Sequence, residues 1–138
     1  MTALEALHGC WAGEEEVFAT AWTPAGRARA ELVLAGGPGD ALIVDYSETR
    51  ADGSMTGHGV VREDGWWWFD SYGFVPASPG TATWNAGELV LERRSERGRN
   101  VMILASDGER LTMRLFAASG DGELEPLVAG EYRRSSSS

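Results

Sequence analysis

Asp70 and Tyr46 are the two side chains whose types and surroundings most favour chemistry on a small molecule. Asp70 directly follows the aromatic run 66–69, so its carboxyl group is expected among aromatic rings. A carboxyl group in such a pocket can orient a polar ligand or act as a general acid or base. The alternative is a structural role, in which Asp70 accepts a hydrogen bond from Tyr46 or from the backbone.

A second polar pair, His58 and Ser71, has the residue types of nucleophilic catalysis. The sequence contains no GxSxG motif that would build an oxyanion hole around a nucleophilic serine. A surface or interface pair is therefore the preferred interpretation. Haem is a further alternative. Its binding would need His8 or His58 to face an open cavity. Two histidines and one cysteine, Cys10, give no metal-ligand spacing, so we expect no metal and no cofactor.

The stretch 56–73 must position these side chains, and it reads as two strands joined by a tight turn. Asp64-Gly65 is a dipeptide typical of a two-residue hairpin turn. That turn would pair Val61 with Trp68 and Gly59 with Asp70. Glycines opposite large side chains leave room for them, so this face is expected to point into the core or into a ligand cavity.

Two more Asp-Gly dipeptides, at 52–53 and 107–108, predict two more hairpins. The first would pair Tyr46 with Gly59, which places Tyr46, Gly59 and Asp70 in one row across three strands. The second would pair Leu104 with Leu111 and Met102 with Met113.

Ten short strands follow one another with turn signals about every 8–12 residues. No strand–helix alternation occurs, which excludes a parallel α/β sheet. A helical turn over 2–8 precedes the first strand. The chain contains no lysine and few prolines to protect exposed sheet edges, which favours closure. We predict an all-β fold: an antiparallel up-and-down barrel of about ten strands, with a short N-terminal helix, over residues 1–134.

Two segments are expected at the barrel rim. The run Glu14-Glu15-Glu16 cannot point wholly outward from a strand, so either one carboxylate faces the interior or the strand bulges there; a solvated rim position is the alternative. The proline-rich segment 74–80 is too interrupted for a central strand and is predicted to be a lid or mouth loop.

Composition excludes several classes of partner. The chain has 138 residues and a net charge of −9, which argues against binding nucleic acid or an anionic membrane surface. No apolar run approaches the roughly 20 residues of a membrane helix. A single cysteine and no recognisable secretion signal predict a cytoplasmic protein. The serines at 135–138 are predicted to form a disordered tail.

Four ordered motifs span nearly the whole chain: LHGCWAGEE at 7–15, GHGV at 57–60, WFDSYG at 68–73 and GEYRR at 130–134. In this order they resemble a bacterial family known only as domain of unknown function number fifteen seventy-nine. Gly9-x-Trp11 after a short helix also resembles the start of the calycin barrels, the lipocalins and fatty-acid-binding proteins. That resemblance implies a lipocalin-like barrel in which Arg133 or Arg134 stacks on Trp11, and it implies no established activity.

The preferred function is binding of a small hydrophobic or amphipathic molecule inside the barrel. The residues expected to line the cavity are Tyr46, Trp66, Trp68, Asp70, Met102 and Met113. One alternative is an isomerase, cyclase or hydratase that uses Asp70 as acid or base; another is a structural module without a cavity. Neighbouring residues in a strand alternate sides, so an outer apolar face is predicted as a homodimer interface, formed by Ile43, Val60, Trp67 and Phe69.

Overall fold

The computed structural model describes residues 5–21, 24–71, 73, 78–95, 98–120 and 122–135. The described chain is almost entirely β, which confirms the predicted fold class. Its ten strands are β1 (Gly9–Val17), β2 (Gly26–Gly36), β3 (Leu42–Arg50), β4 (Gly53–Arg62), β5 (Gly65–Asp70), β6 (Thr81–Asn85), β7 (Glu88–Ser95), β8 (Gly98–Ser106), β9 (Arg110–Ala118) and β10 (Glu125–Arg134), with a 3-10 turn η1 (Pro38–Asp40) before β3. Within the described residues, no helix is both long and apolar enough to cross a membrane.

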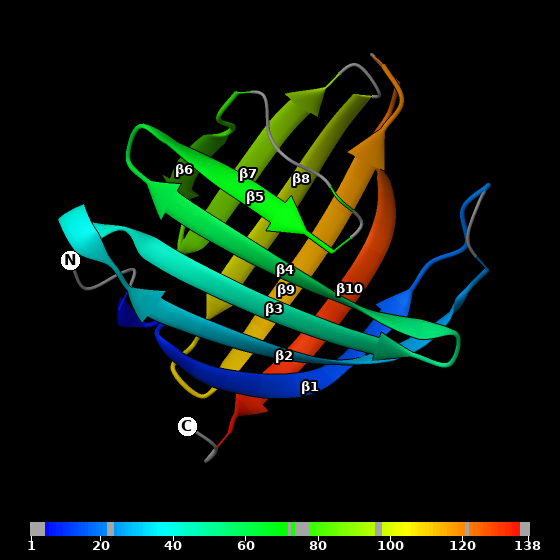
Figure 1. Ribbon diagram of the computed structural model, residues 1–138, viewed down its shortest axis with the longest axis horizontal. Helices are drawn as coiled ribbons and strands as arrows, with labels where there is room; N and C mark the ends of the chain where they lie inside the picture. The colour runs from blue at the N-terminus through cyan, green and yellow to red at the C-terminus, as the bar shows by residue number, and fades with distance from the viewer. Residues whose placement is uncertain are drawn as a thin grey trace.

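The strands form one antiparallel sheet in the order β5-β4-β3-β2-β1-β10-β9-β8-β7-β6. Strands β1 to β5 lie in front in Figure 1 and cross β7 to β10 behind them. The sheet nearly closes where β5 meets the residue before β6: Trp66 and Gly80 exchange two backbone hydrogen bonds of 3.1 and 2.8 Å. The Trp66 indole adds a bond of 3.1 Å from Nε1 to the Glu92 carbonyl on β7. This bridge and the Trp66 indole therefore both join the two edges of the sheet.

Two predicted hairpins have the right faces and the wrong partners. Gly57, not Gly59, pairs with Asp70, and Tyr46 pairs with Gly57. In both hairpins the glycine of the Asp-Gly dipeptide is the first residue of the following strand, with φ of +155° at Gly53 and +154° at Gly65. The turns are therefore formed one residue earlier than predicted, which moves every partner by two residues. A shift of two keeps each side chain on its face.

The third hairpin deviates in the opposite direction. Leu104 pairs with Met113 and Met102 with Leu115, because Ser106 and Leu111 are the last pair before the loop. The Asp107 carboxylate accepts hydrogen bonds from the backbone N–H groups of Glu109, at 2.9 Å, and Arg110, at 2.7 Å. These bonds stabilise the three-residue connection 107–109 between β8 and β9, and the turn is centred one residue later than predicted.

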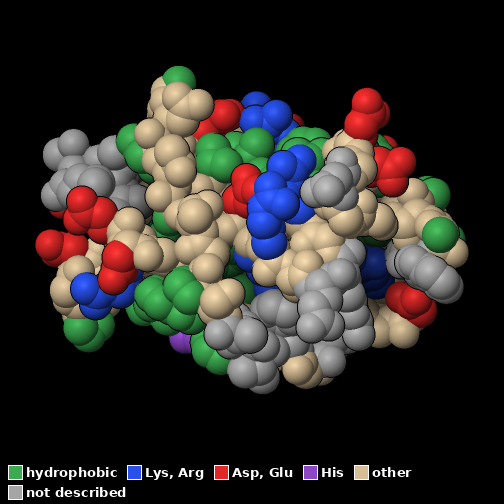
Figure 2. Space-filling model, turned by 90° about the horizontal axis from the view of Figure 1, so that it is seen from above, with side chains coloured by type: hydrophobic (Ala, Val, Ile, Leu, Met, Phe, Trp, Pro, Cys, Tyr) green, Lys and Arg blue, Asp and Glu red, His purple; other side chains and the backbone are tan. Residues whose placement is uncertain are grey.

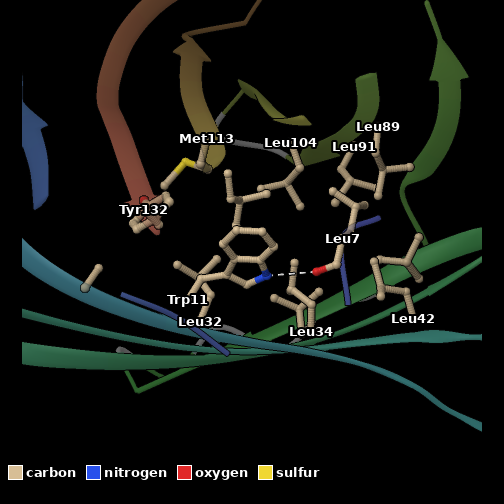
Figure 3. Packing of buried hydrophobic residues seen from close by; sticks show 14 of the residues in the cluster. Leu7, Trp11, Leu32, Leu34, Leu42, Leu89, Leu91, Leu104, Met113 and Tyr132 are labelled. Carbon is tan, nitrogen blue, oxygen red and sulfur yellow. Dashed lines mark hydrogen bonds between the residues drawn. The ribbon is translucent and has the colours of Figure 1, made fainter. Parts of the chain in front are cut away.

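Leu7 and Trp11 fill the end of the barrel where β1 begins. Leu7 is fully buried and Trp11 is 1% exposed, and the indole Nε1 of Trp11 donates to the Leu7 carbonyl at 2.9 Å. Figure 3 shows this bond and the leucines from β2, β3, β7 and β8 around Trp11 and Leu7. The guanidinium of Arg134 lies 4.3 Å from the ring centroid, so the predicted arginine–tryptophan contact is present. We call this the closed end.

The two chain termini are described in part. Glu5 to Leu7 form a single turn, in which the His8 N–H donates to the Glu5 carbonyl at 3.1 Å, so the N-terminal helix is a minor feature. Its first residues, 1–4, lie outside the described residues. Of the predicted serine tail, Ser135 is described and its N–H donates to the Cys10 carbonyl at 2.8 Å.

Candidate functional site: a barrel cavity with a charged mouth

A cavity of about 570 Å³ occupies the other end of the barrel. Its lining includes the last residues of β1, β3, β5, β7 and β9 and the first residues of β4, β8 and β10, which meet at this end because neighbouring strands are antiparallel. We call it the open end. The lining contains all six residues predicted from the sequence: Tyr46, Trp66, Trp68, Asp70, Met102 and Met113. Of the predicted lid at 74–80, residues 74–77 lie outside the described part of the chain.

The predicted aromatic and acidic residues form one contact group on β3 and β5. The Trp68 ring centroid lies 6.3 Å from that of Tyr46 and 6.4 Å from that of Trp66. The indole Nε1 of Trp68 donates to Asp70 Oδ2 at 3.2 Å. Tyr46, Gly57 and Asp70 form the row that the sequence predicted through Gly59 instead. The two register errors cancel, so Tyr46 and Asp70 still share a row.

Gly57 allows Trp68 to take its position in the cavity wall. A Cβ atom at Gly57 would overlap the six-membered part of the Trp68 indole. The prediction that glycines on this face leave room for large side chains opposite them is therefore correct, and it holds most clearly for Gly57. Gly59 is less restrictive, because a Cβ atom there would lie 3.1 Å from Trp68 Cε3.

A buried polar network lies beside the cavity and was not predicted as a unit. Glu15 is fully buried, which confirms that one carboxyl of the run 14–16 faces inward, and Glu48 is 2% exposed. The Tyr46 hydroxyl lies 2.8 Å from both oxygens of Glu15 and 3.0 Å from Glu48 Oε2. The Tyr132 hydroxyl donates to Glu15 Oε2 at 2.5 Å, and Arg50 Nε donates to Glu48 Oε1 at 2.7 Å. The five side chains join β1, β3 and β10 across the barrel interior.

The two glutamates of this network hold different charges. Burial raises the pKa of Glu15 to about 8, and its hydrogen bond to Glu48 adds to the rise. Burial also acts to raise the pKa of Glu48, but hydrogen bonds with Glu15, Arg50 and Tyr46 outweigh it, and that pKa is lowered. Burial, followed by the charge of Glu15, raises the pKa of both tyrosines. At neutral pH Glu15 therefore carries a proton, while Glu48 is ionised and paired with Arg50.

Three arginines line the open end: Arg50, Arg93 and Arg99. Arg93 lies on the inward face of β7, in alternation with the buried Leu89 and Leu91. Burial lowers the pKa of Arg93, and the negative charge of Asp70 partly offsets this effect. Asp70 on β5 and Arg93 on β7 thus interact electrostatically across the nearly closed seam.

Neither histidine lines the cavity, so the geometry that haem would need is not formed by His8 or His58. His58 is exposed on the outer face, where its Nδ1 lies 2.6 Å from Asp45 Oδ1. Its predicted partner Ser71 instead accepts a hydrogen bond at 3.0 Å from the Thr56 N–H, because Phe69 is the residue paired with His58. The predicted His58–Ser71 pair is therefore wrong.

The predicted dimer residues share the outer surface. Ile43, Val60 and Trp67 form one cross-strand row, and Phe69 is 41% exposed. Dimerisation through this face stays a prediction.

The sequence interpretation named Glu15 only within the run 14–16 and overlooked five other residues of the site, and a signal existed for two of the five. Leu89, Leu91 and Arg93 alternate along β7, and Tyr46 and Glu48 continue the inward alternation of β3. That alternation points Arg93 and Glu48 inward. The sequence pattern offered no such signal for the contact between Tyr132 and Glu15, which are 117 residues apart. The five overlooked residues are Glu48, Arg50, Arg93, Arg99 and Tyr132.

Comparison with other proteins supports the fold of this chain but does not assign the chain to a family. No family model and no curated protein sequence matches the chain, so the resemblance to domain of unknown function fifteen seventy-nine is not confirmed. Among solved structures, Rv2717c from M. tuberculosis superposes with a TM-score of 0.68 at 19% identity, over 97% of this chain and 96% of that one.

Two further structures share the architecture at lower identity. The S-type phycobiliprotein lyase CPES from Guillardia theta has a TM-score of 0.66 at 10% identity, over 98% of this chain and 92% of its own. A protein of unknown function from the DUF3598 family of Nostoc punctiforme has a TM-score of 0.63 at 11% identity, over 96% of this chain and 49% of its own. At these identities the likeness establishes a common barrel fold, consistent with a lipocalin-like barrel.

Proposed function

We propose that this protein binds a small hydrophobic or amphipathic molecule in the barrel cavity. The observation that carries the proposal is a hollow of about 570 Å³ with largely apolar walls, whose charged lining residues lie at or near the strand ends of the open end. Ligand sites in proteins commonly enclose about 300–1,000 Å³, with a mainly apolar lining and a few polar groups that fix orientation. The walls of this cavity combine Trp66, Trp68, Met102, Met113 and Leu115, a surface suited to the body of an apolar molecule.

The two alternatives fit the site less well. A structural module would have a filled interior, since protein cores pack without voids of this size. An enzyme using Asp70 as acid or base would need that carboxyl group directed at a substrate. Asp70 instead accepts a hydrogen bond from Trp68 and faces the charge of Arg93, contacts that favour a positioning role in binding.

Mass spectrometry under native conditions, on protein purified from its own host, provides the first test. A retained ligand would appear as a discrete mass above that of the apoprotein. Extraction with organic solvent should release the ligand and restore the apoprotein mass. A mass that stays at the apoprotein value in every preparation, together with failure to bind any apolar probe, would contradict the proposal.

A matched pair of variants locates the binding. Met102 lines the cavity, and the next residue, Ile103, points to the other side of β8. Met102→Trp should fill part of the hollow and weaken binding of an apolar probe such as decanol by about tenfold or more. Ile103→Trp adds a similar ring outside and should leave binding unchanged. Quenching of the fluorescence of Trp66 and Trp68 reports occupancy, with calorimetry as the second readout for the tryptophan variants.

A further inference from the structure

We propose that Glu15 and Glu48 form a proton switch on the cavity: an apolar ligand binds while this pair of carboxyl groups holds one proton, and it is released when the pair loses that proton. The switch rests on the proposed function and adds a means of regulating the same site. Glu48 and Tyr46 line the cavity, and Glu15 hydrogen-bonds both of them from the barrel wall.

The first argument is the burial of the pair. In the described part of the chain, the two buried carboxyl groups are those of Glu15 and Glu48, which are 0% and 2% exposed. Figure 2 shows other acidic side chains at the surface of one face, where they reach water. A carboxylate withdrawn from water must be compensated by hydrogen-bond donors or by positive charge. The donors around the pair therefore decide how many negative charges it can hold.

The second argument is a count of hydrogen atoms. The Tyr46 hydroxyl has one hydrogen atom and lies 2.8 to 3.0 Å from three carboxyl oxygens, two of Glu15 and one of Glu48. Tyr132 supplies a hydrogen atom to Glu15, and Arg50 donates to Oε1 of Glu48. Neither donor supplies the hydrogen bond that joins the two carboxyl groups to each other. Two carboxylates only accept hydrogen bonds, so this bond requires one proton on the pair.

The strands around Glu15 determine what else can compensate its charge. Its partner is Ala28 on β2 and Gly130 on β10, and neither side chain can carry charge. Among the described residues, the titratable and charged side chains that face Glu15 are Tyr132 on β10 and Tyr46, Glu48 and Arg50 on β3. Arg50 already pairs with Glu48 at 2.7 Å. Burial, followed by the hydrogen bond to Glu48, raises the pKa of Glu15 to about 8, which agrees with the count of hydrogen atoms.

Loss of the proton would put charge on the cavity wall. Glu15 and Glu48 would then be two like charges within hydrogen-bond distance, which repel strongly where water is excluded. Glu48 can relieve this repulsion, because it lines the cavity and its partner Arg50 is 27% exposed at the open end. A carboxylate that turns into the hollow brings water with it. The carboxylate and its water would compete with an apolar ligand for the same space.

The sign of the pH dependence follows from this competition. Below about pH 8 the free and the bound protein both hold the proton, so affinity is independent of pH. Above about pH 8 the free protein releases the proton and must regain it to bind, so affinity falls by up to about tenfold per pH unit. The contribution of Glu15 to folding stability is lost in a different range, between pH 4.5 and about 8. Binding and unfolding measurements therefore separate the two effects.

Calorimetric titration of the full chain with decanol, which carries no charge in this pH range, tests the switch. We expect constant affinity up to about pH 7.5 and an affinity about tenfold or more lower at pH 9.5. At pH 9, binding enthalpies in Tris and in borate, which differ in ionisation enthalpy, should reveal uptake of about one proton per ligand. An affinity that is unchanged at pH 9.5, or higher there, would overturn the switch and leave cavity binding intact. Failure of decanol and every other apolar probe to bind at pH 7 would refute the proposed function itself.

Variants of the network locate the proton. Glu15→Gln keeps a donor and an acceptor without ionising, so its decanol affinity should be the same at pH 7 and pH 9.5. Glu14→Gln is the matched control, because the Glu14 side chain is 59% exposed, and it should keep the wild-type decline. Tyr132→Phe removes a hydrogen bond that lowers the pKa of Glu15, so its decline should move to higher pH.

Far-ultraviolet circular dichroism at each pH verifies that the variants are folded, and Tyr132→Phe decides the matter if Glu15→Gln does not fold. A wild-type decline in a folded Glu15→Gln, or an unshifted decline in Tyr132→Phe, would assign the proton to another group and refute the switch.

Discussion

The two ends of this barrel are built from the same ten strands and have opposite interiors. At the closed end, Leu7, Trp11, Leu104 and Leu111 are each at most 1% exposed and belong to the hydrophobic core. At the open end the inward positions of the same strands include charged and half-buried residues as well as buried apolar ones, and they surround a cavity of about 570 Å³. The boundary between the packed end and the hollow end crosses every strand, so it does not separate one group of strands from another.

The comparison teaches that stability and function are separated along the length of each strand. β7 shows this within five residues, since Leu89 belongs to the core, Leu91 belongs both to the core and to the cavity lining, and Arg93 lines the cavity near the end of the strand. A guanidinium at the position of Leu89 would be buried without water, whereas at Arg93 it reaches the mouth of the cavity. The closed end is expected to hold the fold together so that the open end can remain hollow.

The largest expected effect comes from the closed end. Trp11→Ala removes a ring that is 1% exposed, its hydrogen bond to Leu7 and its contact with Arg134, and should lower the free energy of unfolding by about 3–5 kcal/mol. Met102→Ala, at the cavity wall, should cost about 1 kcal/mol, because one side of Met102 faces the hollow. Urea unfolding measures both. Equal losses would show that the two ends do not differ in packing.

A smaller effect is expected where the cavity wall depends on a missing side chain. Gly57→Ala would force the Trp68 ring to move and should destabilise the protein by about 1–3 kcal/mol, with a change in near-ultraviolet circular dichroism. Gly26→Ala is the matched control in the same sheet, because a Cβ atom at Gly26 would meet no atom within 4 Å. An unchanged spectrum for Gly57→Ala would contradict the placement of Trp68.

The smallest effect, counted per pH unit, is a dependence of the free energy of unfolding on pH. It arises from the polar network that lies between the two ends. The pKa of Glu15 is raised to about 8 in the folded protein, from an ordinary value of 4.5. The folded state therefore holds a proton that the unfolded chain releases above pH 4.5. This contribution to stability is complete below pH 4.5 and is lost as pH rises to about 8, at up to about 1.4 kcal/mol per pH unit. The lowered pKa of Glu48 acts oppositely, on the acid side.

Urea unfolding between pH 5 and pH 9 measures this dependence. Glu15→Gln should remove most of the decline, because the amide keeps a donor and an acceptor for the network without titrating. Glu14→Gln is the control, since the Glu14 side chain is 59% exposed and pairs only at the surface with Arg27. A decline that persists in Glu15→Gln would mean that another group holds the proton.

Local sequence patterns predicted the face of each cavity residue better than its partner. Alternation placed Trp66, Trp68 and Asp70 on one face, and a register shift of two residues leaves that face unchanged. The partners were wrong because an Asp-Gly dipeptide permits more than one turn geometry. In the structure, Gly53 and Gly65 use their positive φ at the start of the next strand rather than inside the turn.

The sequence by itself determined the strand count and the inward faces, because these depend on residue alternation and on turn-forming residues close in the chain. For the run 14–16 it predicted only that one carboxylate faces inward or that the strand bulges, and the structure shows that Glu15 is the buried one. Only the tertiary structure decided which end is hollow and which side chains meet there. The pairing of β1 with both β2 and β10 brings Glu15 to Tyr46 on β3 and Tyr132 on β10, and closure at Trp66 brings Asp70 near Arg93. Such contacts join residues far apart in the chain, so they arise only when the sheet curves into a barrel.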